Sequence, residues 1–361
     1  METRSVAGRR LAILGDGHLD FHFGKTAMGV LRYRPQDVVV VIDREMAGQA
    51  TQAAIGLGGD TPIVPSLRAA LSFGPDALLI GVATRGGTIP TEWRPTLLEA
   101  IQNGLDIVCG LHEFLSDDPQ LSAAARLAGV KLIDVRRPPQ ELAVAEGTEH
   151  RASTTVVTMV GSDCAVGKMS VALDIQRESI ARGLDTGFVA TGQTGMMISG
   201  EGIPLDRIIG DFMSGAVERE VLRAAERHEV VLVEGQGSLL HPAYSGVTLA
   251  LIHGSRPDAM ILTVLPARTT IEDYPVEIPR VSELIDMHEV SAGWVKPAPV
   301  IGIAVNSLGL TDEQSNQAIQ AIADETGLPV TDTFRFGADV LSDAVVRFHR
   351  AKVKSSESPS V

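Results

Sequence analysis

The fold of this chain is decided by the stretch Val156-Val157-Thr158-Met159-Val160-Gly161-Ser162-Asp163-Cys164-Ala165-Val166-Gly167-Lys168-Met169-Ser170. A short β-branched run ends at a glycine, a loop of small residues follows, and a helical pattern begins after Gly-Lys. Strand, glycine loop, lysine and helix are the layout of a phosphate-binding loop, or P-loop. Successive backbone N–H groups at a helix N-terminus form a concave, partly positive site for phosphate oxygens. We therefore predict a phosphate site made of Gly161, Ser162, Asp163, Cys164, Ala165, Val166, Gly167, Lys168, Met169 and Ser170.

The loop departs from the usual Walker A motif in two ways. It is one residue longer between its two glycines. Met169 stands where Ser or Thr normally holds Mg²⁺, and Ser170 comes one place late. The longer spacing resembles the loop of dethiobiotin synthetases, which reads Gly-Thr-Asp-Thr-x-Val-Gly-Lys-Thr. The residues that match are Gly161, Asp163, Val166, Gly167 and Lys168. The loop predicts phosphate binding, whereas Met169 argues against metal-assisted ATP chemistry.

Composition restricts the class of protein. The 361 residues are enough for two domains, and 44% apolar with 21% charged residues is typical of a globular chain. The formal net charge of −14 argues against nucleic acid as a main partner, because phosphate backbones need surfaces rich in lysine and arginine. Two cysteines, Cys109 and Cys164, give neither a disulfide framework nor a zinc cluster, and no metal site is expected. No apolar run is long enough for a membrane span or a signal peptide, so we expect a cytoplasmic protein without a membrane partner.

The region of residues 1–145 alternates strand and helix patterns. The apolar run Val38–Ile42 predicts a strand buried on both faces, which is typical of a parallel sheet. Further strands are expected at Leu11–Leu14, Ile63–Val64, Ala77–Ile80, Asp106–Cys109 and Val130–Asp134, with helices at Lys25–Tyr33, Ser66–Leu71, Thr91–Asn103 and Asp118–Ala128. This alternation predicts a Rossmann-like α/β domain with a parallel sheet.

A stretch without periodicity, from Arg136 to Arg151, reads as the linker to a second domain of residues 146–350. This domain is expected to be a P-loop NTPase-like α/β domain. A helix at Gly167–Arg182, a strand at Thr186–Ala190, a glycine loop at Thr191–Gly195 and a mostly helical segment at Asp206–Arg227 follow the P-loop strand. Later strands and helices are expected at Val230–Glu234, Asp258–Leu265, Pro279–Glu289, Val300–Val305 and Asp312–Thr326. Residues 351–361 are polar and serine-rich, and we expect a disordered tail.

Candidate binding residues in the first domain follow its strands, where ligands of α/β folds are bound. Arg85 beside two glycines has the chemistry to hold a carboxylate or phosphate, and His112 has that of a base. A surface arginine and a helix-capping histidine are the alternatives.

Candidate catalytic residues lie around the predicted phosphate site. Glu234 ends an apolar strand at the Walker B position, and a buried charge there is costly unless it is used or paired. Asp211 and His241 are the other acid–base candidates, although a solvated acid and a simple His-Pro turn are the alternatives. Asp163 has the alternative role of bracing its own loop, and Cys164 that of a small loop residue rather than a nucleophile.

The motifs taken together resemble one family across nearly the whole chain, from about Leu11 to Phe348. They are Lys25-Thr26-Ala27, Gly110-Leu111-His112, Gly161 to Lys168, Ala190 to Gly195, Asp211-Phe212 with Gly215-Ala216 and Glu218, and Glu234 to Leu239 with His241-Pro242. The chain is similar to the D-glutamate (D-amino acid) N-acetyltransferases, which pair a Rossmann-like and a P-loop domain and were long of unknown function.

The resemblance implies an acyltransferase that moves acetyl from acetyl-CoA to the amine of D-glutamate or a related D-amino acid. The P-loop would then hold the phosphates of coenzyme A without Mg²⁺. Glu234 or Asp211, with His241 as a rival, would be the base that the ammonium needs. Substrate contacts are expected from Lys25, Arg85, His112, Gln193 and Gln236. A homo-oligomer is also expected.

Two other functions remain open. An ATP- and Mg²⁺-dependent ligase or kinase similar to dethiobiotin synthetase would release ADP. A nucleotide-binding regulatory protein would bind its ligand without turnover. The acids and glycines at several strand ends favour an enzyme.

Overall fold

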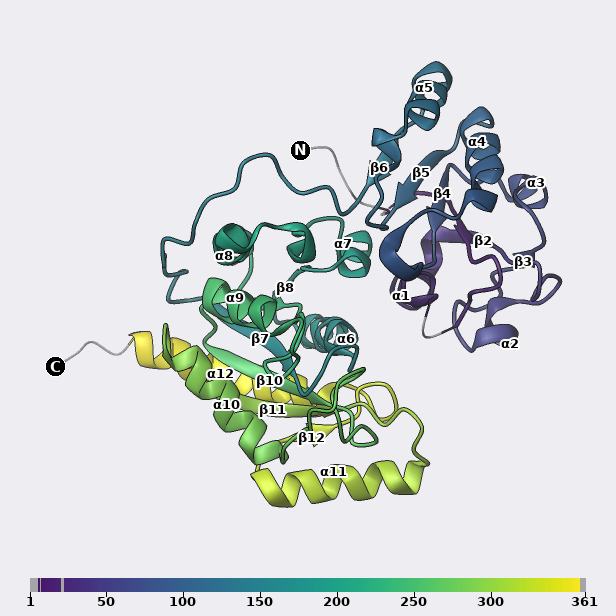
Figure 1. The fold of residues 1–361 in the computed structure, drawn as a ribbon. Coiled ribbons are helices and arrows are strands. Elements are labelled where there is room, and N and C mark those ends of the chain that lie inside the picture. Colours follow the sequence, from purple (N-terminus) through teal and green to yellow (C-terminus); the bar gives the residue numbers. More distant parts are fainter. Residues whose placement is uncertain (1–5, 7, 21–22, 358–361) are drawn as a thin grey trace. The chain divides into compact units, whose positions relative to one another are not determined.

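The computed structural model describes residues 6, 8–20 and 23–357, which form two compact units (Figure 1). The first unit comprises Met1–Pro138 with Gly192–Arg207, and the second comprises Pro139–Thr191 with Ile208–Val361. The sequence predicted a boundary near residue 145. In the structure the first unit ends earlier, and a segment from within the second predicted domain belongs to the first unit.

The first unit is built on a sheet of six parallel strands in its described residues, in the order β3-β2-β1-β4-β5-β6. The strands are β1 (Leu11–Leu14), β2 (Val38–Ile42), β3 (Ile63–Val64), β4 (Ala77–Ile80), β5 (Asp106–Cys109) and β6 (Leu132–Asp134). The helices between them are α1 (Lys25–Tyr33), α2 (Thr51–Ile55), α3 (Leu67–Ala70), α4 (Arg94–Gln102) and α5 (Pro119–Ala128). The chain winds from the central β1 toward one edge and then toward the other, so the predicted Rossmann-like fold is confirmed.

Alternate residues of these strands face two layers of helices. Leu14 and Ile80 belong to a buried core shared with α3, α4 and α5. Ile13 lies on the other face, where a Cβ built on Gly81 would come within 2.5 Å of Ile13 and 2.9 Å of Ala27 in α1. Because both faces are covered, the strands can be apolar throughout, as the sequence shows.

The segment predicted as a glycine loop at Thr191–Gly195 is instead the start of a helix, α7 (Gln193–Ser199). This helix packs against α1 within the first unit, where the Oγ1 atoms of Thr26 and Thr194 lie 3.3 Å apart. Met196 and Met197 are fully buried. Burial of these apolar side chains outweighs the low helix propensity of Gly195.

The second unit contains a sheet of six parallel strands in its described residues, in the order β12-β11-β10-β7-β9-β8. The strands are β7 (Thr155–Gly161), β8 (Thr186–Val189), β9 (Val230–Val233), β10 (Ala259–Val264), β11 (Val300–Val305) and β12 (Val330–Thr331). Its helices are α6 (Lys168–Ala181), α8 (Met213–Ala225), α9 (Ser245–Ser255), α10 (Val281–Gly293), α11 (Asp312–Thr326) and α12 (Asp339–Glu357). The strand that carries the P-loop, β7, lies in the middle of this sheet, and the predicted P-loop fold is confirmed.

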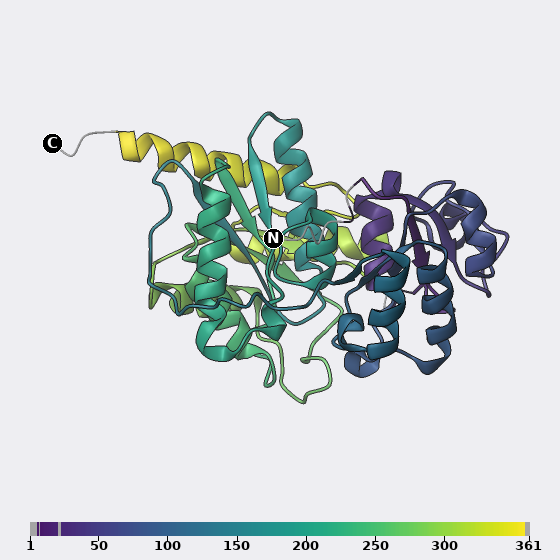
Figure 2. The same ribbon diagram turned by 90° about the horizontal axis from the view of Figure 1, so that it is seen from above.

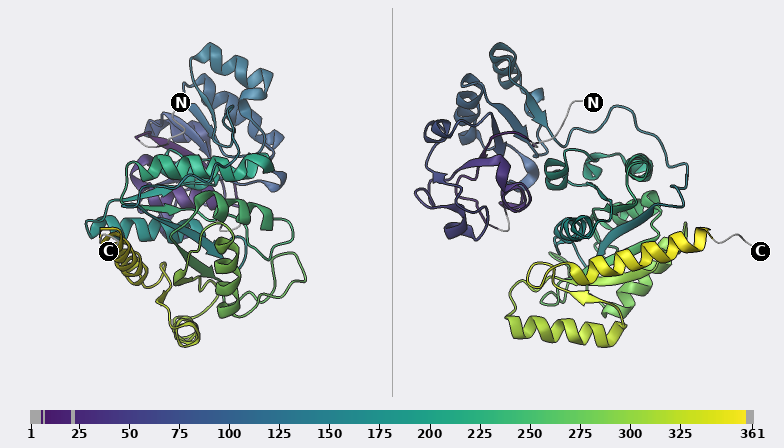
Figure 3. Two further views of the ribbon diagram at one scale, coloured as in Figure 1. Left: turned by 90° about the vertical axis from the view of Figure 1, so that its left-hand side faces the viewer. Right: turned by 180° about the vertical axis from the view of Figure 1, so that it is seen from behind.

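Helices cover both faces of the second sheet. Helices α6 and α12 pack together on one face, while α8, α9 and α10 lie on the other. Seen from above, the long yellow helix α12 lies on one side of the sheet and the green helices lie on the other (Figure 2). The right-hand view, from behind, shows α12 lying in front of the sheet, with α11 below it at the bottom of the picture (Figure 3).

The predicted linker has no helix or strand, but it is firmly attached to the second unit. The buried carboxylate of Glu218, on α8, accepts hydrogen bonds from the backbone N–H groups of Glu146, Gly147 and Thr148 at 3.0–3.3 Å. A Cβ on Gly215 would lie 2.1 Å from the carbonyl oxygen of Ala143, so only glycine allows this approach. The Gly215 and Glu218 motif therefore holds the linker in place.

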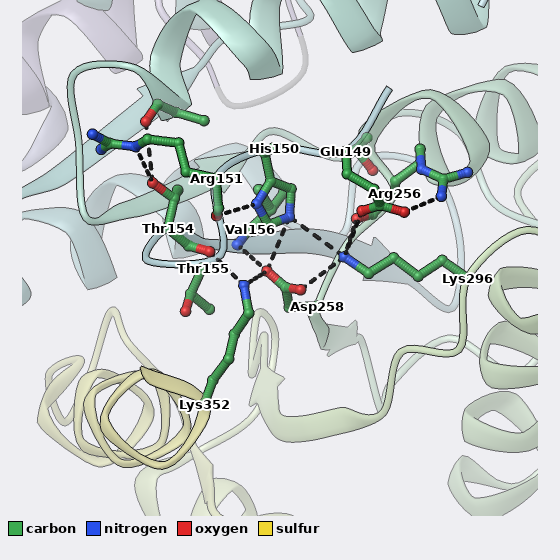
Figure 4. A network of polar contacts seen from close by, with 12 residues as sticks. Glu149, His150, Arg151, Thr154, Thr155, Val156, Arg256, Asp258, Lys296 and Lys352 are labelled. Carbon is green, nitrogen blue, oxygen red and sulfur yellow. Dashed lines mark hydrogen bonds and ion pairs between the residues drawn. The ribbon is translucent and has the colours of Figure 1, made fainter. Parts of the chain in front are cut away.

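The predicted disordered tail is wrong for residues 351–357, because α12 continues to Glu357; residues 358–361 lie outside the described part. Lys352 donates to the buried carboxylate of Asp258 at 2.8 Å and to the backbone oxygen of Thr154. Lys296 donates to Asp258 at 2.8 Å, and the Nε2 atom of His150 lies 3.1 Å away (Figure 4). These ionic contacts near the start of β7 and β10 hold the C-terminal end of α12, although the composition of that end alone predicts disorder.

None of the helices in the described residues is both long enough and apolar enough to cross a membrane.

Candidate functional site

The P-loop links the end of β7 to the start of α6, as the sequence predicted. Gly167 has a φ of +111° immediately before the helix, and Ala165 has a φ of +54°. A non-glycine residue in this region is strained, and such strain is concentrated at ligand-binding sites. The loop is further held by Asn306, whose side-chain nitrogen donates to the Val166 oxygen at 2.9 Å, and by Ser238, whose hydroxyl donates to the Ser162 oxygen at 3.0 Å.

Lys168 is buried at the first position of α6. Its ammonium donates to the backbone oxygens of Asp163 and Gly237, both at 2.8 Å. Burial lowers the pKa of Lys168 from 10.5 to about 8, although the nearby Cys164, Asp163 and Glu234 act in the opposite direction. The lysine is thus held by neutral carbonyl groups, and an anion in the loop would supply the counter-charge that they lack.

Asp163 braces the loop, which is one of the two roles considered from the sequence. One carboxylate oxygen of this buried residue accepts from the Cys164 N–H at 2.6 Å. The other accepts from Arg268 Nη1 at 2.8 Å and from the Glu272 N–H at 2.9 Å. Arg268 also donates to the Cys164 oxygen at 3.0 Å. Asp163 therefore connects the P-loop to the long loop between β10 and α10.

Arg268 was missed by the sequence analysis. It follows β10 in a stretch without a recognised motif, and only the neighbouring position of β10 and β7 in the sheet brings it to the P-loop. A sequence signal was present in the mostly polar stretch Arg268 to Asp273 shortly after a buried strand, because parallel strands carry functional loops at their carboxyl ends.

Glu234 lies where the sequence placed it, directly after β9. It is 4% exposed, and its Oε2 atom accepts from the Thr191 N–H at 2.8 Å. Thr191 in turn donates from its hydroxyl to the backbone oxygen of Glu234 at 2.9 Å. The carboxylate thus ties the ends of β8 and β9 together and contributes negative charge beside Lys168.

His241 lies next to the P-loop in the structure. A nitrogen of its buried ring, the Sγ atom of Cys164 and a carboxylate oxygen of Asp163 all lie within 4.8 Å of one another. The ring contacts Tyr244 at a centroid distance of 4.5 Å and Tyr274 at 5.0 Å. Both tyrosines are exposed in part, so they lie between the buried ring and the surface of the second unit.

The cluster of Asp163, Cys164 and His241 has the residue types of a metal site, but its hydrogen bonds do not fit one. The Asp163 carboxylate is occupied by N–H donors, including the guanidinium of Arg268. The Nδ1 atom of His241 accepts from the Ala243 N–H at 3.2 Å, which places the proton of the neutral ring on Nε2. A metal-bound histidine has the opposite arrangement, since its second nitrogen donates a hydrogen bond.

Cys164 is half-buried beside this cluster. Burial raises the pKa of its thiol, with the negative charges of Asp163 and Glu272 acting in the same direction and Lys168 and Arg268 opposing them. A raised pKa keeps the thiol protonated, which agrees with a loop residue rather than a nucleophile.

The other two candidates of the second unit lie outside these contacts. Asp211 is exposed in a short helical turn, Gly210–Phe212, before α8 rather than within a long helix as predicted. The side chain of Gln236 is partly buried, and its backbone oxygen accepts from the Thr248 hydroxyl at 2.9 Å.

Two substrate-binding candidates of the first unit come together around a third residue, Arg136, which sequence analysis did not select. Arg136 Nε donates to the Gly110 oxygen at 2.7 Å and to Gln193 Oε1 at 3.2 Å. Its Nη1 atom lies 3.0 Å from His112 Nε2 and pairs with Asp206. Burial, followed by the charge of Arg136, lowers the pKa of His112 below its usual value. This polar cluster lies after β5 and β6, where a Rossmann-like sheet binds its ligands.

The remaining candidates of the first unit do not join this cluster. Lys25 is exposed at the first position of α1. The side chain of Arg85 lies outside the described part of the chain, although its backbone forms a short helical turn, Arg85–Gly87.

Each of the two units matches a known domain family. Residues 44–138 match the Rossmann-like domain, and residues 143–342 match the P-loop domain, of DUF1611, a family described as of unknown function. The chain belongs to the DUF1611 family. A DUF1611 protein from Anabaena variabilis, known from a crystal structure, is 41% identical with a TM-score of 0.88, covering 94% of this chain and 100% of that one.

Two curated relatives of this DUF1611 chain carry the name D-glutamate N-acetyltransferase. The protein from Tritonibacter scottomollicae is 40% identical over 337 residues, which cover 93% of this chain and 97% of its own. The protein from a Pseudoalteromonas species is 35% identical over 276 residues, which cover 76% of this chain and 82% of its own. The family resemblance stated from the sequence motifs is confirmed.

Proposed function

We propose that this chain is an N-acetyltransferase that moves the acetyl group of acetyl-CoA to the amino group of D-glutamate or a related D-amino acid. The names of the two curated relatives, which cover most of their own lengths in the match, support the reaction class and the acceptor. The observation that supports acetyl-CoA as the acetyl donor is the P-loop itself. It presents backbone N–H groups and Lys168 to a phosphate, while Met169 stands in the place of the usual magnesium ligand.

Coenzyme A suits such a loop because it carries a diphosphate and a 3′-phosphate that take no part in the reaction. Phosphoryl transfer needs a metal to neutralise charge that develops on the γ-phosphate, whereas a bound, unreactive phosphate needs only donors and cations. A P-loop without its metal-binding hydroxyl is therefore sufficient for acetyl-CoA.

The pantetheine arm separates the thioester from the diphosphate. With the diphosphate in the P-loop, the acetyl group lies at the far end of the pantetheine arm. Residues that touch the loop are then placed to hold phosphate. His241 and Glu234 therefore belong to the phosphate end of the proposed site. Asp211, an exposed carboxylate, is then the preferred base for the acceptor ammonium.

The acceptor needs donors for its carboxylates and a group that stabilises the tetrahedral oxyanion. In the second unit, Gln236 remains a candidate for the carboxylates. In the first unit, taken by itself, the Arg136 guanidinium with Gln193 and His112 beside it has the chemistry to hold a carboxylate, and Lys25 and Arg85 remain candidates there.

Acetyl-CoA binding by the variant K168A tests the phosphate role. We expect its affinity to fall by about tenfold or more, since a charge-assisted hydrogen bond contributes roughly 1.5–3 kcal/mol. Unchanged affinity would rule out the P-loop as the coenzyme site. Thiol release against a panel of D- and L-amino acids identifies the acceptor, and formation of ADP from ATP and Mg²⁺ would instead favour a ligase or kinase.

A further inference from the structure

We propose that Arg268 and His241 complete the P-loop as a diphosphate site that works without a metal ion, with His241 acting as a neutral hydrogen-bond donor. This inference deepens the proposed function, because it rests on the P-loop as the site of the coenzyme diphosphate.

The charge of a diphosphate sets the requirement. A P-loop that uses Mg²⁺ neutralises phosphate charge with the metal and one lysine. Here the metal-binding hydroxyl is replaced by Met169, and Lys168 is the one positively charged residue of the loop residues 161–170. A second cation beside the loop is therefore needed for a tightly bound diphosphate.

Arg268 is that cation. Its Nη1 atom is fixed at the loop backbone by the Asp163 carboxylate at 2.8 Å and by the Cys164 oxygen at 3.0 Å, and its Nη2 atom lies 3.6 Å from Glu272. A guanidinium carries five N–H donors in a rigid fork, and the described contacts do not use all of them. The side chain is 22% exposed, so the remaining donors can reach a ligand.

His241 adds a donor whose direction is set by its environment. Because Nδ1 accepts the Ala243 N–H, the proton of the neutral ring is on Nε2. Tyr244 and Tyr274 contact the ring and hold its orientation beside Cys164 and Asp163. The basic nitrogen of the neutral ring, Nδ1, already accepts the Ala243 N–H, so the nitrogen left for a ligand is Nε2, which donates a hydrogen bond to a phosphate oxygen.

A third observation points to a ligand at the same loop. The hydroxyl oxygen of Ser162 is buried and has no hydrogen-bond partner among the described residues. A buried hydroxyl in that state is costly, and an acceptor bound in the loop would satisfy it.

The test is the affinity for inorganic pyrophosphate and for acetyl-CoA, measured by calorimetry in EDTA and again with Mg²⁺. We expect the unmodified protein to bind both ligands in EDTA, with no gain from Mg²⁺. H241A should weaken binding about tenfold, whereas H241Q, whose amide N–H can replace Nε2–H, should stay within about threefold of the unmodified protein.

R268A should weaken binding by about tenfold or more, and R268K by less, because lysine keeps the charge and loses the fork. R350A is the matched control, since Arg350 is exposed on α12 near His349, which contacts Thr155 at the opposite end of β7. The melting temperature of each variant shows whether it is folded, and the His241 pair tests the proposal separately if the Arg268 variants are less stable.

Two results would overturn the proposal: a requirement for Mg²⁺, or an H241Q variant as weak as H241A. The proposed function fails separately. If pyrophosphate binds with the expected pattern but no amino acid releases thiol from acetyl-CoA, the diphosphate site stands and the acetyltransferase does not. If acetyl transfer occurs while all four variants keep their affinity, the acetyltransferase stands and the proposed roles of Arg268 and His241 do not.

Discussion

The guanidinium of Arg268 lies 2.8 Å from the carboxylate of Asp163, and this buried ion pair joins the P-loop to the long loop between β10 and α10. Asp163 is completely inaccessible to solvent, while Arg268 remains 22% exposed. Asp163 therefore has a structural role, and Arg268 keeps N–H donors at the surface of the site. Because the two charges are paired, a cation lies at the loop and the buried carboxylate has a partner.

Replacing Asp163 with asparagine tests this bracing role. The variant keeps an acceptor for N–H groups but leaves Arg268 without its counter-charge, so we expect the second unit to lose about 3 kcal/mol of unfolding free energy. Acetyl-CoA affinity should fall as well, because the loop backbone loses its support. Urea unfolding of both proteins measures the first effect. An asparagine variant as stable as the unmodified protein would show that the ion pair adds nothing.

The titration of Lys168 gives a pH dependence with a definite sign. Its pKa is lowered to about 8 in the free protein, so the ammonium loses its proton as the pH rises through this value. A phosphate binds the charged form, and acetyl-CoA affinity should therefore decline above pH 8 by up to about tenfold per pH unit. K168A should give weak affinity that does not change over the same range. A flat profile in the unmodified protein would contradict the role of Lys168 as the phosphate cation.

The same shift has the opposite consequence for stability. The unfolded chain keeps a lysine pKa of 10.5, above the folded value of about 8. Between these values the unfolded state binds more protons, so the contribution of Lys168 to the unfolding free energy increases as the pH rises. K168M, which has no titrating group, should lack this increase when both proteins are unfolded across the window.

Glu218 belongs to a motif of the family, yet the structure gives it a structural role. Its carboxylate accepts three backbone N–H groups from the linker. E218A should leave these donors unsatisfied and lower the unfolding free energy by about 2 kcal/mol, whereas E218Q retains an acceptor and should lose less. The rate of acetyl transfer at a temperature where both variants are folded should be unchanged. A large loss of rate in the stable E218Q protein would assign Glu218 to the reaction.

Asp258 should support the end of α12. Burial alone would raise the pKa of this carboxyl group, but hydrogen bonds from His150, Lys296 and Lys352 hold the pKa well below its usual range. A depressed pKa means stability that is fully present above about pH 4 and is lost as the pH falls further. D258N should cost about 3 kcal/mol at neutral pH.

Removal of residues 351–361 tests the same contact from the other side. The deletion takes away Lys352, so it should lower the melting temperature. The single variant K352A, which leaves the chain at full length, should reproduce most of this loss. A deletion without any effect would show that the helical end contributes nothing to stability.

Most of the fold was predictable because strand and helix patterns are local. The run Val38–Ile42 is apolar at every position since both faces of its sheet are covered, and the strand, glycine loop, lysine and helix around Lys168 follow one another directly in the sequence. The helix α7 and the tail of α12 were not predictable in this way. Each is stabilised by groups distant in sequence: the buried contact of Thr194 with Thr26 in one case, and the ion pair of Lys352 with Asp258 in the other.

The candidate site divides along the same line. Lys168, Asp163 and Glu234 were selected because they belong to motifs within one or two strands. Arg268 and Arg136 were missed, since neither stands in a motif and each reaches its partners through the order of strands in a sheet. The hydrogen bond to Nδ1 of His241 also cannot be read from sequence, and it is the observation behind our proposal that this residue donates to a phosphate instead of acting as a base.

Acetyl transfer by this chain is proposed to need no metal, and the decisive measurement is thiol release from acetyl-CoA in the presence of D-glutamate and EDTA. We predict release that depends on D-glutamate or a related D-amino acid, survives EDTA, and falls sharply in K168A. Absence of release with every amino acid, together with ADP formed from ATP only when Mg²⁺ is present, would contradict it.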